Sequence, residues 1–418
     1  MAQPTTKAVD TIESALDGAK IPEATNDLED ILSIALMVPM DDPANADCRM
    51  GLPTMIWGPP GAGKSRRIDQ AAAELDLHLE TIYPSTKMPE DFNDLPVVIQ
   101  ERLMTACMMT QVNTLNLHKK GVLFVDETSL AVPAVQGAML PMVLDRKVGS
   151  TVIHPQIRPL LAGNPPKYAA GGWGLSAPFA NRMLHFYVQR PTREALIKYV
   201  ISMGTSNKIS LSNATEKLVA AWPKEWAVAK SHWAGFIRVC TDQAFGIDPD
   251  PENVQSGYCW PSPRSWEMAI RACATARCLD KREALIHLMI EAAVGEGAAA
   301  EFIEYLSKAD LPDPMDVLLK GWKVDTKRLD RSMAVATGFT ALVVGTREKN
   351  EQVKLAIGAW HRYNEYVKEG LTDIVMDHMD SLIREGLNTD HANVALKEAA
   401  GEVIYAIGKT PAMRYAKG

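Results

Sequence analysis

A glycine-rich run, GPPGAGKS at 58–65, is the feature that most constrains how these 418 residues can fold. Two glycines separated by four residues and followed by Lys64-Ser65 form the pattern of a phosphate-binding loop, in which backbone amides and a lysine ammonium surround phosphate oxygens. That mechanism requires a strand before the loop and a helix after it, and the segments 54–57 and 65–75 predict these two elements. We therefore expect the loop to bind a nucleoside triphosphate through Gly58, Pro59, Pro60, Gly61, Ala62, Gly63, Lys64 and Ser65.

Two acidic residues, Asp126 and Glu127, follow the apolar run VLFV. An acid at the end of a core strand beside a phosphate loop can hold a Mg²⁺-bound water, and a second acid can polarise the water that attacks the γ-phosphorus. Taken alone, the pair would more simply mark the solvated end of a strand. Because it lies downstream of a phosphate loop, we expect Ser65 and Asp126 to hold Mg²⁺ and Glu127 to be catalytic, which favours hydrolysis over phosphoryl transfer to an organic substrate.

A third polar residue, Asn164, ends the apolar run LLAG. At the carboxyl edge of a parallel sheet its amide could contact both the γ-phosphate and the attacking water. The alternative is a turn asparagine before two prolines. Together with the other two motifs, the first interpretation is favoured.

Short apolar runs alternate with helix patterns between residues 78 and 188, which predicts a buried parallel sheet of the α/β class. Because Pro159 lacks a ladder donor, we expect the strand before Asn164 to begin only at Leu160. Further helices are expected in NDLEDILSIALMV (26–38), with Asn26 and Glu29 as a capping box, in RLMTACMMTQVN (102–113) and in VQGAMLPMVL (135–144). Beyond residue 191 helix patterns dominate, and ALVVG (341–345) is the apolar run there that could form a strand.

The charge balance argues against a dedicated nucleic-acid-binding protein. The first 50 residues contain ten acidic and three basic residues, which equals the formal net charge of −7, so the rest of the chain is neutral. Duplex-binding proteins usually carry a basic surplus, because neutralising phosphates supplies much of their affinity. With no apolar run of membrane-spanning length and an acidic N-terminus, we expect a cytoplasmic protein without a membrane anchor, and the six scattered cysteines indicate neither a disulfide framework nor a zinc site.

In this order and spacing, the loop at 58–65, Asp126-Glu127 and Asn164 resemble the Walker A, Walker B and sensor 1 elements of an AAA+ ATPase. Two further segments make the chain similar to the MoxR branch of that superfamily. KMPEDFNDLP (87–96) resembles its acidic insert near the second helix, and the segment around residues 148–150 resembles its β-hairpin before sensor 1. The resemblance covers residues 28–315 and implies a P-loop sheet followed by a helical lid.

The resemblance assigns functions to two arginines. Arg264, in SPRSW, matches sensor 2, which would reach from the lid to the γ-phosphate of the same subunit, where a permanently charged guanidinium suits phosphate oxygens. Arg182, in FANRM, matches the arginine finger that a neighbouring subunit inserts. The family pattern has Asp before this arginine and Phe after it, whereas this chain has Asn181 and Met183. The alternatives to Arg182 are Arg146, Arg158 and Arg190, and for each of them a surface salt bridge is the simpler interpretation.

The chain is thus expected to have four parts: a polar lead-in (1–24), an AAA+ α/β nucleotide-binding domain (25–190), a helical lid domain (191–315) and a helical C-terminal extension (316–418). The resemblance implies an ATP hydrolase that uses Mg²⁺ and acts as a homo-oligomer, a hexameric ring, to remodel a protein client. Clients of this branch include proteins with a von Willebrand factor A domain. The alternatives are an AAA+ nucleic-acid motor or loader, a nucleotide-gated scaffold and a small-molecule kinase.

Overall fold

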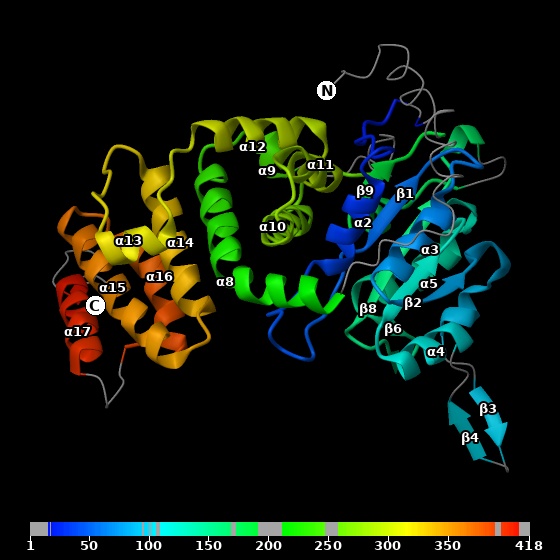
Figure 1. Cartoon of the computed structure of the whole chain (residues 1–418), viewed down its shortest axis with the longest axis horizontal. Coiled ribbons are helices and arrows are strands. Elements are labelled where there is room, and N and C mark those ends of the chain that lie inside the picture. Colours follow the sequence, from blue (N-terminus) through cyan, green and yellow to red (C-terminus); the bar gives the residue numbers. More distant parts are fainter. Residues whose placement is uncertain are drawn as a thin grey trace, which may run out of the picture. The chain divides into compact units, whose positions relative to one another are not determined.

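We describe a computed structural model of the chain (Figure 1). The structure describes residues 16, 18–93, 96–99, 102–105, 109–168, 173–190, 211–246, 258–388 and 394–408. The first 15 residues of the expected lead-in and the start of the expected lid domain (191–210) lie outside the described residues.

A five-stranded parallel sheet forms the centre of the first of two compact units. In spatial order its strands are β2 (His78–Ile82), β5 (Gly121–Val125), β8 (Ile157–Gly163), β1 (Thr54–Trp57) and β9 (Leu184–Tyr187). Every residue of β1, β5, β8 and β9 is buried, as a parallel sheet covered by helices requires. The predicted fold class, an α/β phosphate-loop sheet followed by helices, is confirmed.

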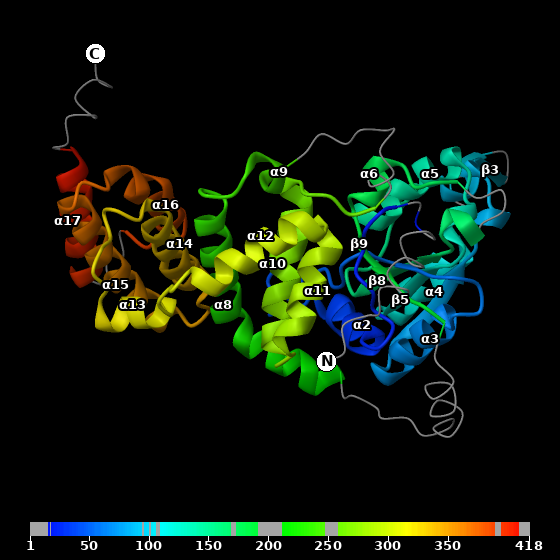
Figure 2. The ribbon, with the colours of Figure 1, turned by 90° about the horizontal axis from the view of Figure 1, so that it is seen from above.

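Helices cover this sheet (Figure 1). α3 and α4 contact β2, and α11 contacts β9. α10 and α11 lie side by side and both contact α2 (Figure 2). The helices of this part are α2 (Leu28–Met37), α3 (Lys64–Glu74), α4 (Thr110–His118), α5 (Pro133–Leu144), α6 (Ala177–Ala180), α9 (Asp242–Phe245), α10 (Pro263–Cys278) and α11 (Glu283–Val294). Single 3₁₀ turns form η1 (Pro84–Thr86), η2 (Pro89–Phe92), η3 (Thr128–Leu130) and η4 (Pro166–Tyr168).

Two predicted element starts are wrong. β8 begins at Ile157, three residues before the expected Leu160, and includes Pro159. β8 pairs with β5 from Ile157 onward, but it pairs with β1 only from Leu160. Pro159, which has no N–H to donate, therefore lies where β8 has a partner strand on one side only, and the strand tolerates it there. α2 begins at Leu28 after Asp27 without a side-chain cap, so the expected capping box is absent.

The segment 102–113, expected to be one helix, is instead divided. β3 (Pro96–Ile99) pairs antiparallel with β4 (Arg102–Thr105), and α4 begins only at Thr110. The hairpin expected around residues 148–150 is present, since β6 (Lys147–Val148) pairs with β7 (Thr151–Val152) across Gly149, whose φ is +56°. Both hairpins stand outside the central sheet.

The second compact unit is helical and combines residues 220–241 with 301–418. α8 (Leu211–Phe236) and α12 (Glu296–Lys308) run from one unit into the other. The remaining helices are α13 (Pro314–Lys320), α14 (Leu329–Gly345), α15 (Lys349–Lys368), α16 (Thr372–Arg384) and α17 (Val394–Gly408). Phe339, Trp360 and Tyr363 are fully buried in its core, and ALVVG is part of α14 rather than a strand. The expected boundaries at 190 and 315 stay predictions.

Within the described ranges, no helix is both long enough and apolar enough to cross a membrane.

Candidate nucleotide-binding site

The glycine-rich loop joins the end of β1 to the start of α3, as predicted. Gly61 and Gly63 have φ of +76° and +80°, which L side chains rarely adopt. A Cβ on Gly58 would lie 2.4 Å from the carbonyl oxygen of Val188, so the loop requires glycine there for close backbone approach. Gly63 is the N-cap of α3, and the first amides of a helix have no acceptor within it. The loop therefore presents backbone donors where an anion can bind.

Lys64 is buried in this loop with only 8% of its surface exposed. Its Nζ donates hydrogen bonds to the carbonyl oxygens of Gly58 (2.8 Å) and Pro59 (3.2 Å) and to Oδ1 of Asn164 (2.9 Å). Burial lowers the pKa of Lys64 from 10.5 to about 8, and the charge of Asp126 partly opposes that shift. The ammonium thus has neutral oxygens as hydrogen-bond partners, and a bound phosphate would supply the anion that its charge lacks.

Asp126 lies directly after β5, beside the start of α3. Its Oδ2 accepts a hydrogen bond of 2.7 Å from the hydroxyl of Ser65. A hydroxyl and a carboxylate are oxygen ligands of the kind Mg²⁺ prefers, and Mg²⁺ commonly completes its shell with phosphates and water. The Ser65 hydroxyl and the Asp126 carboxylate, 2.7 Å apart, are a donor set that fits such a partly protein-ligated cation. Ser65 and Asp126 are therefore together as predicted.

Glu127 occupies an unusual backbone position. Its φ is +55°, in the left-handed region, and its amide donates to Oδ1 of Asp126 at 2.9 Å. The hydroxyl of Ser85, in η1, donates to Oε2 of Glu127 at 3.3 Å. A non-glycine residue held in this region costs about 1–3 kcal/mol, and such residues cluster at functional sites. The exposed carboxylate stays accessible beside Asp126.

Asn164 follows β8 and reaches the loop through its bond with Lys64. The backbone amide nitrogen of Asn164 donates to the hydroxyl of Ser129 at 3.0 Å. Ser129 is only 3% exposed and was not identified from the sequence. It lies in η3, and its bond joins residues 35 positions apart in the chain, so no local sequence pattern marks it. Ser129 fixes the backbone from which Asn164 projects.

The three alternatives to Arg182 have other contacts. Arg146 and Arg158 are 5% and 2% exposed, and their guanidinium groups bind backbone carbonyl oxygens. Burial lowers the pKa of Arg146 to about 9 and that of Arg158 to about 10. Arg190 lies at the loop of its own chain, where it donates to the carbonyl oxygen of Pro60 at 3.4 Å. Two of these arginines are therefore structural, and the third adjoins the phosphate loop.

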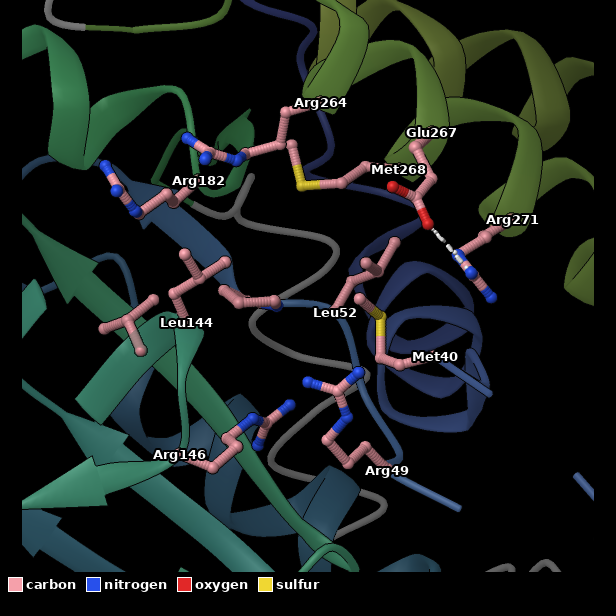
Figure 3. A pocket seen from close by; sticks show the side chains of 12 residues that line it. Met40, Arg49, Leu52, Leu144, Arg146, Arg182, Arg264, Glu267, Met268 and Arg271 are labelled. Carbon is pink, nitrogen blue, oxygen red and sulfur yellow. Dashed lines mark hydrogen bonds and ion pairs between the residues drawn. The ribbon is translucent and has the colours of Figure 1, made fainter. Parts of the chain in front are cut away.

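Arg182 and Arg264 line one pocket (Figure 3). Arg182, just after α6, donates to the carbonyl oxygen of Pro178, and its Nε is buried without a partner among the described residues. Arg264, in the first turn of α10, is exposed. Burial lowers the pKa of Arg182, and the neighbouring charge of Arg264 lowers it further. The remaining lining residues are Met40, Arg49, Leu52, Pro53, Val143, Leu144, Arg146, Glu267, Met268 and Arg271.

The site residues thus fall into two groups. Lys64, Ser65, Asp126, Glu127 and Asn164 meet at the carboxyl edge of β1, β5 and β8. Arg264 shares a pocket with Arg182, and among the described residues it has no hydrogen bond with any member of the first group.

Comparisons with known proteins give only a distant likeness. No protein-family model matches the chain, and no curated protein matches it. Among solved structures, it is similar to the crystal structure of a "putative ATPase" from Cytophaga hutchinsonii ATCC 33406, at 13% sequence identity and a TM-score of 0.40. The match covers 68% of this chain and 85% of that one.

Proposed function

We propose that this protein is a Mg²⁺-dependent ATP hydrolase of the AAA+ type, similar to the MoxR branch. The observation that carries the proposal is the convergence of Lys64, the Ser65–Asp126 pair, Glu127 and Asn164 at the end of three adjacent parallel strands. Each group meets a separate requirement of phosphoryl transfer to water. Lys64 is a cation that can bind phosphate, Ser65 and Asp126 are oxygen ligands for a metal, Glu127 is a base, and Asn164 is a polar amide.

In this mechanism the loop amides and Lys64 bind the β- and γ-phosphates. Ser65 and Asp126 would hold Mg²⁺, which when bound would neutralise charge on the phosphate oxygens. Glu127 takes a proton from a water molecule while the water oxygen bonds to the γ-phosphorus and the bond to the leaving ADP oxygen breaks. Asn164 donates its amide hydrogen to the γ-phosphate and helps to place the water.

Substitution of Glu127 tests the proposal. We expect Glu127→Gln to bind ATP within about three-fold of the parent affinity but to release phosphate at least about 100-fold more slowly, because an amide cannot accept the proton. Lys64→Ala should lose ATP binding itself. Glu74→Gln, an equivalent change at the end of α3, is the matched control. Turnover by Glu127→Gln equal to that of the parent would instead support a nucleotide-gated scaffold or another catalytic base.

We further propose that the protein works as a ring-shaped homo-oligomer, hexameric in the related branch, on a protein client such as one with a von Willebrand factor A domain. The resemblance of 28–315 to that branch supports this, and so does the neutral charge of residues 51–418. Complexes trapped in native cells with Glu127→Gln and ATP should contain a protein client reproducibly. Recovery of nucleic acid in its place, with salt-dependent binding to it, would favour the motor or loader.

A further inference from the structure

One buried side chain, Gln136 in α5, connects two segments that follow β5 and β8. It is only 1% exposed. Its Nε2 donates to the carbonyl oxygens of Ala131 and Gly174, both at 3.1 Å, and its Oε1 accepts from the backbone amide of Ser176 at 3.2 Å. All three bonds go to backbone atoms. The amide of Gln136 therefore joins the loop before α5 to the segment 173–176.

Ser129 lies between the points that Gln136 holds. It is in η3, two residues before Ala131, and its carbonyl oxygen accepts a bond of 2.8 Å from the Trp173 amide. Its hydroxyl accepts from the backbone amide of Asn164 at 3.0 Å. Ser129 is thus bound on one side to the segment that Gln136 fixes and on the other side to the residue that follows β8.

The contact between Ser129 and β8 leaves little room for movement. A Cβ on Gly163, the last residue of β8, would lie 3.1 Å from Oγ of Ser129 and 3.3 Å from its Cβ. Because the two backbones approach so closely, a small shift of Ser129 moves its hydroxyl either against β8 or away from the Asn164 amide. The side chain of Asn164 in turn accepts the bond from Lys64. Its position at the phosphate loop therefore depends on where Ser129 is held.

We propose that Gln136 is a positioning residue for ATP hydrolysis, which fixes Ser129 by joining the two segments around it and through Ser129 fixes Asn164. The proposal rests on the proposed function, which assigns Asn164 to the γ-phosphate and the attacking water. An amide suits this position, because one nitrogen donates twice while the oxygen accepts. Among the described residues, Gln136 has no hydrogen bond with the phosphate loop. Its effect should fall on the placement of Asn164 and not on ATP affinity.

Hydrogen exchange at single amides tests this connection independently of activity. Gln136→Met keeps a side chain of similar length but makes none of the three bonds. Although Gln136 does not bond Asn164, we expect the backbone amide of Asn164 to exchange at least about ten-fold faster in this variant, together with the amides of Trp173 and Ser176. Parental exchange at Asn164 would overturn the proposal.

Gln352→Met is the matched control. Gln352 is also buried, at 7% exposed, and lies on α15 in the helical unit. The same substitution there should lower stability but change neither kcat nor exchange at the Asn164 amide by as much as two-fold. Equal acceleration at Asn164 in both variants would show a general loss of stability and would contradict a specific role of Gln136.

Phosphate release and ATP binding give a second readout. Gln136→Met should lower kcat about five-fold and leave the KM for ATP within about two-fold, because Lys64 and the loop amides still hold the nucleotide. In an Asn164→Ala background the same change should lower kcat less than two-fold further, since residues that act through one group are not additive. Parental kcat in a folded Gln136→Met protein, or a full five-fold loss in the Asn164→Ala background, would exclude the positioning role.

Gln136→Glu serves if Gln136→Met does not fold. An ionised carboxylate keeps an acceptor for the Ser176 amide but has no proton to donate to Ala131 and Gly174, so it should show the same lower kcat and faster exchange at Asn164. Melting temperatures show whether each variant is folded at the assay temperature. If the parent releases no phosphate from ATP, the proposed function fails, whereas the exchange result tests the role of Gln136 separately.

Discussion

At the scale of single residues, Lys64 is the most informative group of the site. Its ammonium is buried and donates to two loop carbonyl oxygens and to the side-chain oxygen of Asn164. These acceptors are neutral, so they supply hydrogen bonds but no negative charge. The lowered pKa, about 8, follows from that burial. Phosphate binding would raise it again, so protonation and nucleotide affinity are linked.

This linkage predicts how affinity depends on pH. Above about pH 8 the nucleotide-free protein loses the Lys64 proton, which must be taken up again when ATP binds. ATP affinity should therefore fall as pH rises, by up to about ten-fold per unit. Titrations between pH 7 and 9.5 measure this directly. Lys64→Arg, whose charge is permanent, should show a flat profile, and a flat profile in the parent would contradict the assigned environment.

Ser129 gives a second residue-scale prediction. Without its hydroxyl the backbone N–H of Asn164, which is partly buried, loses its acceptor at 3.0 Å, and such a loss costs up to about 1–3 kcal/mol. We expect Ser129→Ala to lower kcat about ten-fold because Asn164 is less firmly placed, while ATP affinity stays within about three-fold. Phosphate release and equilibrium binding distinguish the two effects. A Ser129→Ala variant with unchanged kcat would show that Ser129 does not position Asn164 for the reaction.

The first group of site residues was predictable because each follows an apolar run, and the carboxyl ends of parallel strands meet at one edge. Lys64, Ser65, Asp126 and Asn164 are close together for this reason. The placement of Arg264 was not predictable, since it depends on how α10 packs rather than on strand order. Ser129 contacts Asn164 through a bond between segments far apart in the chain, and no local pattern marks such a bond.

At the scale of elements, α2 connects the phosphate-loop helix to the helices that follow the sheet. Glu29 forms a bidentate pair with Arg67 of α3, at 2.8 Å for both bonds, while Asp27 and Asp30 bond Arg282 and Lys281 before α11. Glu29, expected to cap α2, instead joins two helices. Each pair is partly exposed and worth at most about 1 kcal/mol, so α2 is held mainly by its buried apolar face.

The hairpin of β3 and β4 shows why element type was misjudged at 102–113. Residues of a short apolar segment satisfy helix and strand periodicity equally well, and pairing with a neighbouring segment then decides the outcome. At Pro159 the sequence argument made the strand too short. Pairing with strands on both sides determines where β8 begins, and one missing hydrogen-bond donor does not prevent it.

A buried histidine couples β1 to β9. His185 accepts a bond of 2.9 Å from the Trp57 indole through Nδ1 and donates from Nε2 to the Ala180 carbonyl, also at 2.9 Å. Trp57 precedes the phosphate loop, and Ala180 precedes Asn181. The bond from Trp57 requires the neutral ring, because Nδ1 accepts it. Burial lowers the pKa of His185 to about 4, and the bond to the Ala180 carbonyl only partly opposes that shift.

Acid should therefore destabilise the fold through this residue. The unfolded chain binds a proton near pH 6.5 and the folded chain only near pH 4, so stability is lost as pH falls between these values, by up to about 3 kcal/mol. Urea unfolding at pH 7, 5.5 and 4.5 measures the loss. In His185→Gln, which cannot titrate, the slope between pH 6.5 and 4.5 should be shallower, and equal slopes in both proteins would exclude His185 as the cause.

At the scale of the whole molecule, the chain divides into a unit that contains the nucleotide site and a helical unit whose core is built around Phe339, Trp360 and Tyr363. All residues proposed for chemistry, including both arginines, belong to the first unit. The described residues of the helical unit contribute none of them.

The central proposal is that a nucleotide held by one copy is completed by Arg182 of a second copy. Its most direct test is phosphate release per chain as a function of protein concentration, with light scattering in the same ATP and Mg²⁺ buffer. The account predicts that turnover per chain rises in parallel with assembly and approaches zero for the monomer. Full turnover per chain at concentrations where scattering detects only monomer would contradict it.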